Sequence, residues 1–481
     1  MRKRSVFSVV GALTALTGLT MLFPAAVAAA FYREAASVPI AAAAVLSMAT
    51  GFAVNRWAGP VADISIREGF AIVTLGWLSV AVFGSLPYLL TGSIPSVSGA
   101  FFESISGLTT TGSSVVVDID ALPRGIVLWR SQTQWLGGMG IIVLSVAILP
   151  LLGVGGMQLM QAEIPGLSAD RLRPRVRHTA TLLWGVYALF TVTEGILLWA
   201  FGMTPFEALN HALTTMATGG FSTEDTSLAA FDPAVQYVVV VFVFLAGVNF
   251  TLHYSWLTGR WGAIRRNQEL RVYALITLVA TSGLTLLVWL PGTTGGFEES
   301  LRIGLFQATS IMTTTGYANA DYELWLPAAQ VVILLLMLVG GCTGSTAGSI
   351  KVLRHMIVAK EAQFSMRRLL HPRGVFVYKV EGKPVTSDTL ASVSGFLLLY
   401  LLTLGAGIFA LALLGLDSLT ALGAAATTLG NVGPGFGMVG PAETFASLPS
   451  AALWVLSGLM LLGRLELYTV LILLTRGYWR R

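Results

Sequence analysis

The feature that most constrains the fold is a series of long apolar stretches that carry almost no charge. Each reaches or exceeds the roughly 20 residues that a helix needs to cross a bilayer. They lie near 6–31, 38–59, 69–92, 125–152, 180–203, 234–258, 271–291, 325–350, 389–415 and 449–475. Only 11% of the 481 residues are charged, which is less than half of the ~25% typical of soluble domains. The sequence therefore predicts an all-α integral membrane protein with ten spans.

The first stretch resembles a secretory signal peptide, because a basic start (residues 1–4) precedes an apolar run and small residues near 25–30. The apolar run continues to Phe31, however, and so exceeds the roughly 7–15 apolar residues of a signal peptide. We therefore expect a retained transmembrane helix, which forms a hairpin with the next stretch.

Four shorter apolar segments lie between the long ones, near 97–112, 205–219, 300–316 and 418–433. Each is too short to cross a bilayer and ends at a glycine, which indicates a half-helix that enters the membrane and a loop that returns. Twenty-four of the 29 Lys and Arg residues fall at the N-terminus, at 56 and 67, in 171–177, 260–271 and 351–383, and in the last six residues. They share one side only if the short segments re-enter. The positive-inside rule makes that side the cytoplasm, with both termini there, as in a multi-pass protein of the cytoplasmic (inner) membrane.

The short segments are copies of one motif. Their final glycines, Gly112, Gly219, Gly316 and Gly433, are 107, 97 and 117 residues apart, and each lies between two long stretches. This periodicity predicts four pseudo-symmetric helix–pore-loop–helix repeats around one pore. The predicted units are an N-terminal hairpin over 1–62 and repeats over 63–165, 166–262, 263–375 and 376–481. The alternative is ordinary tight packing by small residues, which four copies with consistent charge sidedness disfavour.

An ion pathway explains why such loops carry threonine and glycine. Backbone carbonyls replace the water of a dehydrated cation without fixed charge, and glycine allows the conformations that aim successive carbonyls at one axis. The helix before each loop directs its negative C-terminal end towards the pore. Since no acidic residue adjoins the four glycines, a monovalent cation is favoured over calcium. The predicted ion-binding residues are Thr110, Thr111, Gly112, Ala217, Thr218, Gly219, Thr314, Thr315, Gly316, Asn431, Val432 and Gly433.

These loops resemble those of the Trk/Ktr/HKT superfamily of potassium transporters, most closely the TrkH type. The likeness covers essentially the whole chain, and the N-terminal hairpin favours TrkH over the shorter Ktr type. It is carried by the three Thr-Gly loops, the fourth loop (431–437), the run 340–351, and 463–466 in the last span. One departure is Ser349, where the family usually has glycine. The resemblance implies potassium as the transported ion, with rubidium following it, and one critical glycine per repeat predicts imperfect exclusion of sodium.

A glycine-rich run interrupts the span 325–350. Four glycines among hydroxyl residues disfavour a lipid-facing helix, and irregular backbone at this depth is tolerated only inside protein or along a cavity. The resemblance implies an intramembrane gating loop that blocks the pore on the cytoplasmic side of the filter. Its residues are Gly340, Gly341, Cys342, Thr343, Gly344, Ser345, Thr346, Ala347, Gly348 and Ser349.

Arg464 lies inside the last apolar stretch, where a buried charge is costly and a function or a partner is the default expectation. Similar arginines in the family help to form a cation barrier with the gating loop. The alternative is a structural arginine that pairs with Glu466 or with carbonyl groups. Residues i and i+2 of one helix do not face each other, so Glu466 is a poor partner within the helix.

The segment 351–388 is the longest and most basic of the cytoplasmic segments and suits docking of a soluble regulator, although basic loops also set topology and contact anionic lipid. The resemblance implies a cytosolic nucleotide-binding regulator of the TrkA type and a homodimer with one pore in each subunit. The chain has no Walker A motif and no dinucleotide fingerprint. Nucleotide is therefore expected on the regulator, and neither an organic cofactor nor nucleic acid on this chain.

Two other functions remain open. A potassium symporter coupled to protons or sodium would use the same scaffold, and Glu194 inside a span is either proton-linked or hydrogen-bonded within the bundle. An intramembrane enzyme is the remote alternative, because the chain lacks GxSxG, HExxH and paired intramembrane aspartates, and its one cysteine has no histidine nearby within the span. In the short helices, Glu103 and Glu207 are expected to brace the structure and His211 to pack.

Overall fold

A computed structural model of the chain describes residues 2–61, 64–147, 169–292, 294–371, 379–380 and 382–480. Within these ranges the only strands form one small antiparallel hairpin, β1 (Lys379–Val380) and β2 (Lys383–Pro384). The predicted all-α class is therefore confirmed. The predicted boundaries at 62/63, 165/166 and 375/376, and the predicted end of a span at 152, lie outside the described residues.

The helices of the first half of the chain are α1 (Lys3–Val27), α2 (Ser37–Ala58), α3 (Ile66–Gly84), α4 (Leu86–Thr91), α5 (Val97–Leu108), α6 (Arg124–Ala147), α9 (Ala169–Ala200), α10 (Pro205–Met216), α11 (Pro233–Ala246), α12 (Phe250–Leu257) and α13 (Trp261–Arg266). Those of the second half are α14 (Gln268–Trp289), α15 (Phe297–Met312), α16 (Pro327–Met337), α17 (Val352–Leu370), α18 (Ser387–Leu413), α19 (Ser418–Gly430), α20 (Ser450–Arg464), α21 (Tyr468–Leu471) and α22 (Arg476–Trp479). One π-helical turn extends α1 (Ala28–Tyr32), and short 3₁₀ turns cover Ser227–Ala230, Tyr322–Leu324, Gly437–Val439, Phe445–Ser447 and Ile472–Leu474.

Not all of the ten predicted spans are continuous helices in the part of the chain that the structure describes. Six described helices are long and apolar enough to cross a membrane, and the number rises to eight if each of two bent pairs counts as one span. The predicted span 234–258 bends by 102° between α11 and α12, and the span 449–475 bends by 110° between α20 and α21. The predicted span 325–350 stops being helical at Met337. Hydropathy does not detect the two bends, because it averages the few polar residues at them, such as Asn249 and Glu466, with long apolar stretches on either side.

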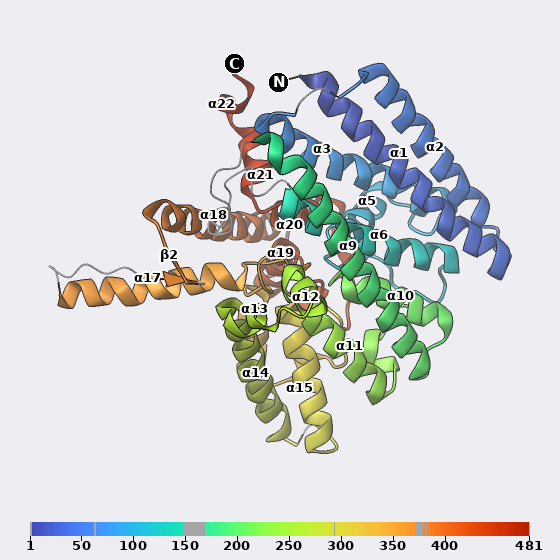
Figure 1. Ribbon diagram of the computed structural model, residues 1–481. Coiled ribbons are helices and arrows are strands. Elements are labelled where there is room, and N and C mark those ends of the chain that lie inside the picture. Colours follow the sequence, from blue (N-terminus) through green and yellow to red (C-terminus); the bar gives the residue numbers. More distant parts are fainter. Residues whose placement is uncertain are drawn as a thin grey trace.

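The first two helices pack closely through small residues. A Cβ built on Gly51 of α2 would lie 2.4 Å from the backbone nitrogen of Ala15, and one on Gly18 of α1 would lie 2.6 Å from the carbonyl oxygen of Ala44. Glycine at such contacts lets two membrane helices approach until their backbones touch. The two helices run side by side at one edge of the molecule (Figure 1).

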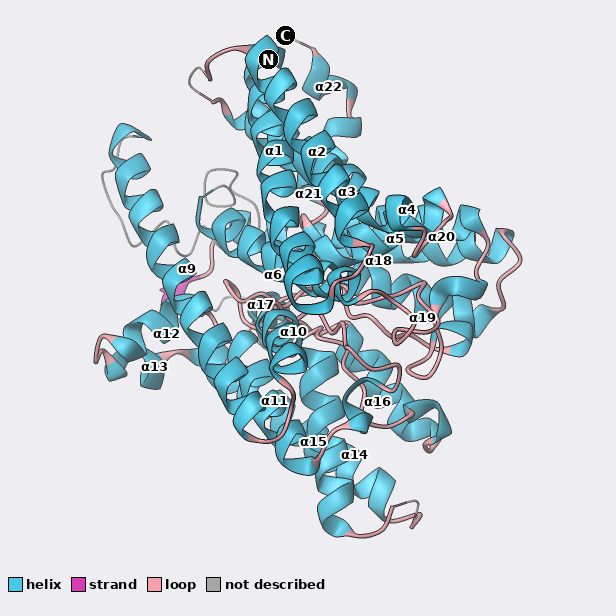
Figure 2. Ribbon diagram, turned by 90° about the vertical axis from the view of Figure 1, so that its right-hand side faces the viewer, coloured by secondary structure: helices cyan, strands magenta, loops and turns pink. Residues whose placement is uncertain are grey.

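The two ends of the chain lie close together (Figures 1 and 2). The phenolic hydroxyl of Tyr478 donates to the carbonyl oxygen of Arg67 at 2.6 Å, and the Arg67 guanidinium donates to the carbonyl oxygen of Arg480 at 3.2 Å. The start of α3 and the last turn of the chain are thus joined. Helix α17, by contrast, projects away from the rest of the molecule, and its last residues are exposed (Figure 1).

Candidate functional site

Four short helices, α5, α10, α15 and α19, end in buried turns of the same geometry. At the end of each helix one residue takes a left-handed conformation, and the next residue donates its backbone N–H to the carbonyl five positions earlier. The left-handed residues are Thr110, Thr218, Thr314 and Asn431, with φ of 50°, 53°, 58° and 55°. The residues that donate back are Thr111, Gly219, Thr315 and Val432, with bonds of 2.8–2.9 Å.

The next residue in each turn is a glycine with positive φ: Gly112 (84°), Gly220 (79°), Gly316 (78°) and Gly433 (116°). The structure therefore corrects the predicted repeating glycine of the second loop, which is Gly220 and not Gly219. Gly219 corresponds to Thr111, and Gly220 takes the place of the repeating glycine. The Thr-Gly motif predicts Gly219 because the second loop has two successive glycines, and the threonine precedes the first of them.

The four loops contact one another in a closed ring. A Cβ built on Gly112, Gly220, Gly316 or Gly433 would lie 2.2, 2.0, 1.9 or 2.8 Å from the carbonyl oxygen of Gly219, Thr315, Val432 or Thr111, respectively. Each oxygen belongs to the residue just before the glycine of the next loop. The contacts thus run from the first loop to the second, third and fourth, and back to the first. No side chain fits at these four positions.

The other glycine of loop two, Gly219, is required for a different reason. The three atoms nearest to a Cβ built on Gly219 all belong to the Gln134 carboxamide of α6, at 2.3–2.8 Å. That carboxamide donates to the Gly219 carbonyl oxygen at 2.6 Å and accepts from the backbone N–H of Phe221 at 3.1 Å. Gln134 therefore occupies the space that a threonine side chain fills in the first and third loops.

A cavity of about 150 Å³ opens above the ring and is lined by all four positive-φ glycines. Glu224, Asp225 and Glu443 also line it, and acidic groups of this kind favour cations over anions at a pore mouth. Burial, reinforced by Asp120 and Glu207, raises the pKa of Glu224. The negative charge of Glu224 is therefore lost at a less acidic pH than that of an ordinary glutamate.

The glycine-rich run lies against the opposite face of the ring. The chain from 338 to 351, between α16 and α17, is not helical. The backbone N–H of Gly348 donates to the Thr314 hydroxyl at 2.6 Å, and the Thr346 hydroxyl donates to the carbonyl oxygen of Met216 at 3.2 Å. A Cβ on Gly348 would lie 2.4 Å from the carbonyl oxygen of Gly430. The run thus contacts the C-terminal ends of three of the four short helices.

Two neighbouring elements hold this run in place. The backbone N–H of Cys342 donates to the Gly247 carbonyl oxygen at 2.8 Å, and that of Phe250 donates to the Gly344 carbonyl oxygen at 3.1 Å. The bend between α11 and α12 therefore wraps around the run. On the other side, Glu269 of α14 accepts the backbone N–H groups of Thr343 (2.7 Å) and Leu353 (3.2 Å).

The departure at Ser349 has a structural explanation. Its φ of 52° is left-handed, a conformation that favours glycine. The Ser349 hydroxyl donates to the carbonyl oxygen of Met337 at 2.8 Å, which is the last residue of α16. This hydrogen bond partly offsets the backbone strain, so the serine is compatible with the same loop shape.

Arg464 is buried at the end of α20, where the chain bends. Its Nη1 donates to the Thr346 carbonyl oxygen in the glycine-rich run at 2.8 Å. Its Nε and Nη2 have no hydrogen-bond partner among the described residues. A buried charge of this kind inside a membrane protein is costly and indicates a functional role.

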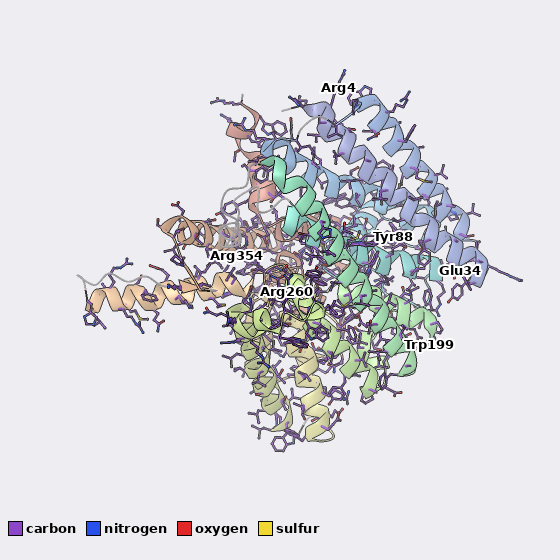
Figure 3. All side chains as sticks on the ribbon, in the orientation of Figure 1. Arg4, Glu34, Tyr88, Trp199, Arg260 and Arg354 are labelled. Carbon is purple, nitrogen blue, oxygen red and sulfur yellow. The ribbon has the colours of Figure 1, made fainter. Side chains whose placement is uncertain are left out.

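Glu466 does not pair with Arg464. It forms an ion pair with Arg354 of α17, whose guanidinium also lies over the ring of Phe396 at 4.0 Å. Figure 3 shows Arg354 near the point where α17 leaves the body of the protein. Lys351 is buried as well and donates to the Ala347 carbonyl oxygen. No pattern in the sequence distinguishes the buried Lys351 and Arg354 from the exposed basic residues of the same segment.

Removing the Glu269 carboxylate is expected to loosen the glycine-rich run. In the Glu269→Ala variant the N–H groups of Thr343 and Leu353 lose a buried acceptor, which costs about 1–3 kcal/mol. Amide exchange across 340–353 should rise by about tenfold or more in hydrogen–deuterium exchange. Glu269→Gln keeps an acceptor oxygen and is the matched control. Equal protection of 340–353 in wild type and Glu269→Ala would contradict this role.

The described residues thus define a polytopic all-α membrane protein in which four glycine loops meet above a buried, irregular run of chain. The sequence profile of the TrkH family, described as a cation transport protein, matches residues 38–292 and 297–477. The chain therefore belongs to the TrkH family, and it is a transporter rather than an enzyme.

Individual relatives agree with this assignment over their full length. The chain is 38% identical over 486 residues to the Trk system potassium uptake protein TrkH of Salmonella typhimurium, and 40% identical over 500 residues to that of Vibrio parahaemolyticus, with 100% of each chain covered. It is 36% identical to TrkG of Escherichia coli, with 99% of both chains covered. The crystal structure of the potassium transporter TrkH from Vibrio parahaemolyticus superposes with a TM-score of 0.91, at 38% identity and complete coverage.

Proposed function

We propose that this protein takes up potassium across the cytoplasmic membrane through a selectivity filter built by the four glycine loops. The observation that carries the proposal is the closed ring of contacts between each positive-φ glycine and the carbonyl of the next loop. Four backbone segments around one axis supply the oxygen rings that replace the hydration shell of an ion. The names of the full-length relatives, which are potassium uptake proteins, support potassium as that ion.

The chemistry of the loops favours a monovalent cation. The loop residues on either side of the four glycines are hydroxyl, amide, apolar or glycine residues, so the ligands are neutral oxygens. The short helices point their C-terminal ends at the ring, which adds a negative potential. In this assignment the filter consists of residues 110–112, 218–220, 314–316 and 431–433, with Ala217 as the helix cap of the second loop.

The run 340–349 acts as the gate in this proposal. Its contacts with Thr314 and Met216 put it directly beneath the ring, and Arg464 adds a positive charge that repels cations. A cytosolic nucleotide-binding regulator of the TrkA type would act on this gate from the basic segment 351–388, and the transporter would work as a homodimer with cytoplasmic termini. The Arg354–Glu466 pair links α17, which follows the gate, to the bend after Arg464.

A coupled symporter on the same scaffold is the second candidate, and Glu194 favours it. This carboxyl group is fully buried in α9, where its hydrogen-bonding neighbour is the Thr215 hydroxyl of α10 rather than a basic side chain. Current recordings in bilayers with a potassium gradient separate the two mechanisms. A channel reverses at the potassium equilibrium potential at every pH, as we expect. A reversal potential that moves with the proton or sodium gradient would establish coupling.

A further inference from the structure

One position of the short helices contacts the chain that leaves the ring. It lies eight residues before the residue that donates back to the helix, and it is Glu103 in α5, His211 in α10 and Gln307 in α15. All three side chains are fully buried. Each one bonds a residue two to four positions after the positive-φ glycine of its own loop. We call these three residues the braces.

The first brace is an ion pair. The Glu103 carboxylate accepts the hydroxyl of Ser114 at 2.9 Å and the backbone N–H of Val115 at 2.9 Å. Arg130 of α6 donates its Nε–H to the same carboxylate at 2.8 Å, and its guanidinium lies over the ring of Phe221 at 4.2 Å. Phe221 directly follows Gly220. Arg130 therefore supports the first loop through Glu103 and also links the first loop to the second through Phe221.

The second and third braces are neutral. His211 Nδ1 lies 2.9 Å from the Glu207 carbonyl oxygen and carries the proton, so Nε2 accepts the Ser222 hydroxyl at 3.1 Å. The Gln307 amide donates to Asn319 Oδ1 and to the Ala320 carbonyl oxygen, both at 3.3 Å. The chemistry of the braces differs from repeat to repeat, whereas their position in the helix stays the same and each contacts the chain just beyond the glycine of its own loop.

The fourth repeat has no brace of its own. The corresponding residue of α19 is Ala424. The chain after Gly433 is held from the third repeat instead, where the Tyr322 hydroxyl donates to the Gly435 carbonyl oxygen at 2.7 Å and Glu323 accepts the Gly437 N–H at 2.6 Å. Every loop is thus fixed on its far side by at least one buried side chain.

We propose that the braces are positioning residues that set the preference of the ring for potassium over sodium. This inference rests on the proposed filter. In the size-selection account of carbonyl filters, a ring prefers the larger ion because its loops resist closing around the smaller one. A hydrogen bond from a buried side chain to the chain beyond each glycine supplies that resistance. Without a brace, the loop relaxes towards the axis, and sodium competes better while transport continues.

Rubidium uptake into proteoliposomes that hold the purified full-length protein tests this inference, with sodium and potassium as competitors. In Gln307→Ala, the ratio of the half-inhibitory sodium concentration to that of potassium is expected to fall by about fivefold or more. Ser222→Ala removes the target of the second brace with a minimal change in volume, and a smaller fall of about twofold is expected. Thr309→Val is the matched control, because the buried Thr309 hydroxyl of the same helix has no partner among the described residues.

The Gly316→Ser variant, measured in the same assay, distinguishes failure of the brace proposal from failure of the filter proposal. If Gly316→Ser shifts the ratio and both Gln307→Ala and Ser222→Ala leave it at the wild-type value, the brace proposal is wrong and the filter stands. If Gly316→Ser also leaves uptake and the ratio unchanged, the filter itself is wrong, and the brace proposal is lost with it. If Thr309→Val lowers the ratio as much as Gln307→Ala does, any substitution in α15 changes selectivity, and the specific role of the brace is contradicted.

Discussion

Replacing Gly220 by alanine is expected to reduce potassium uptake by about tenfold or more. The φ of 79° at this position is costly for a residue with a Cβ, and the added carbon would lie 2.0 Å from the carbonyl oxygen of Thr315 in the next loop. Because the clash is with backbone, a side-chain rotation cannot relieve it. The second and third loops must move apart, and the carbonyl ring opens. Rubidium uptake by the purified variant measures the loss.

The matched comparison is Gly219→Ala in a Gln134→Ala background. Gly219 does not have a positive φ, and the atoms nearest to its Cβ all belong to the Gln134 side chain, so the second substitution clears the space. We expect this double variant to transport far better than Gly220→Ala. If Gly220→Ala transports better than the double variant, Gly219 is the repeating glycine, and the register that the structure gives to loop two is contradicted.

Replacing Arg464 by alanine is expected to raise rubidium uptake by the protein alone about tenfold or more. Two like charges a few ångströms apart repel by a few kcal/mol at an effective dielectric constant of about 20, and this repulsion opposes a cation below the ring. The variant also loses the 2.8 Å hydrogen bond to the Thr346 carbonyl oxygen, so the run 340–349 is held less firmly. Both changes favour an open pathway.

Arg464→Lys separates these contributions, because it keeps the positive charge and changes the hydrogen-bonding geometry. Uptake by Arg464→Lys should stay close to that of wild type if charge is the main barrier. If Arg464→Ala folds normally and transports no faster than wild type, Arg464 is a structural residue and the gating role fails.

The sequence was sufficient to predict an all-α membrane protein with several apolar helices, because these depend on local apolar length. It failed at the register of the second loop. The repeating feature there is a backbone conformation, with φ near 80° at Gly220. The sequence alone does not show which of two adjacent glycines adopts it. What distinguishes them is Gln134, which lies 85 residues away from Gly219 along the chain.

The two bends, between α11 and α12 and between α20 and α21, are not predicted from the sequence for a related reason. The bend of 110° after α20 includes Glu466 and Leu467 with φ of 57° and 52°, and neither residue is a recognised helix breaker. These left-handed residues are tolerated because tertiary contacts, including the ion pair of Glu466 with Arg354, hold them. Such contacts join residues 112 positions apart, so only the folded chain reveals them.

The equivalence of the three braces is a third feature that the sequence does not predict. Glu103 was expected to brace its helix and His211 to pack, and both are buried and hydrogen-bonded. Their equivalence with Gln307 appears only when the helices are aligned on their backbone hydrogen bonds, since the three side chains share no chemistry. A sequence pattern that requires similar residues cannot detect a position whose shared property is its geometry.

The most direct test of the central claim is rubidium uptake into liposomes that hold the purified protein alone, with competition by potassium, sodium and lithium. The four-loop filter predicts uptake that potassium blocks at much lower concentration than sodium or lithium. If the wild-type protein shows no uptake on its own, the Arg464→Ala variant is used for the same measurement. Equal competition by potassium and sodium in that variant would contradict a potassium-selective ring.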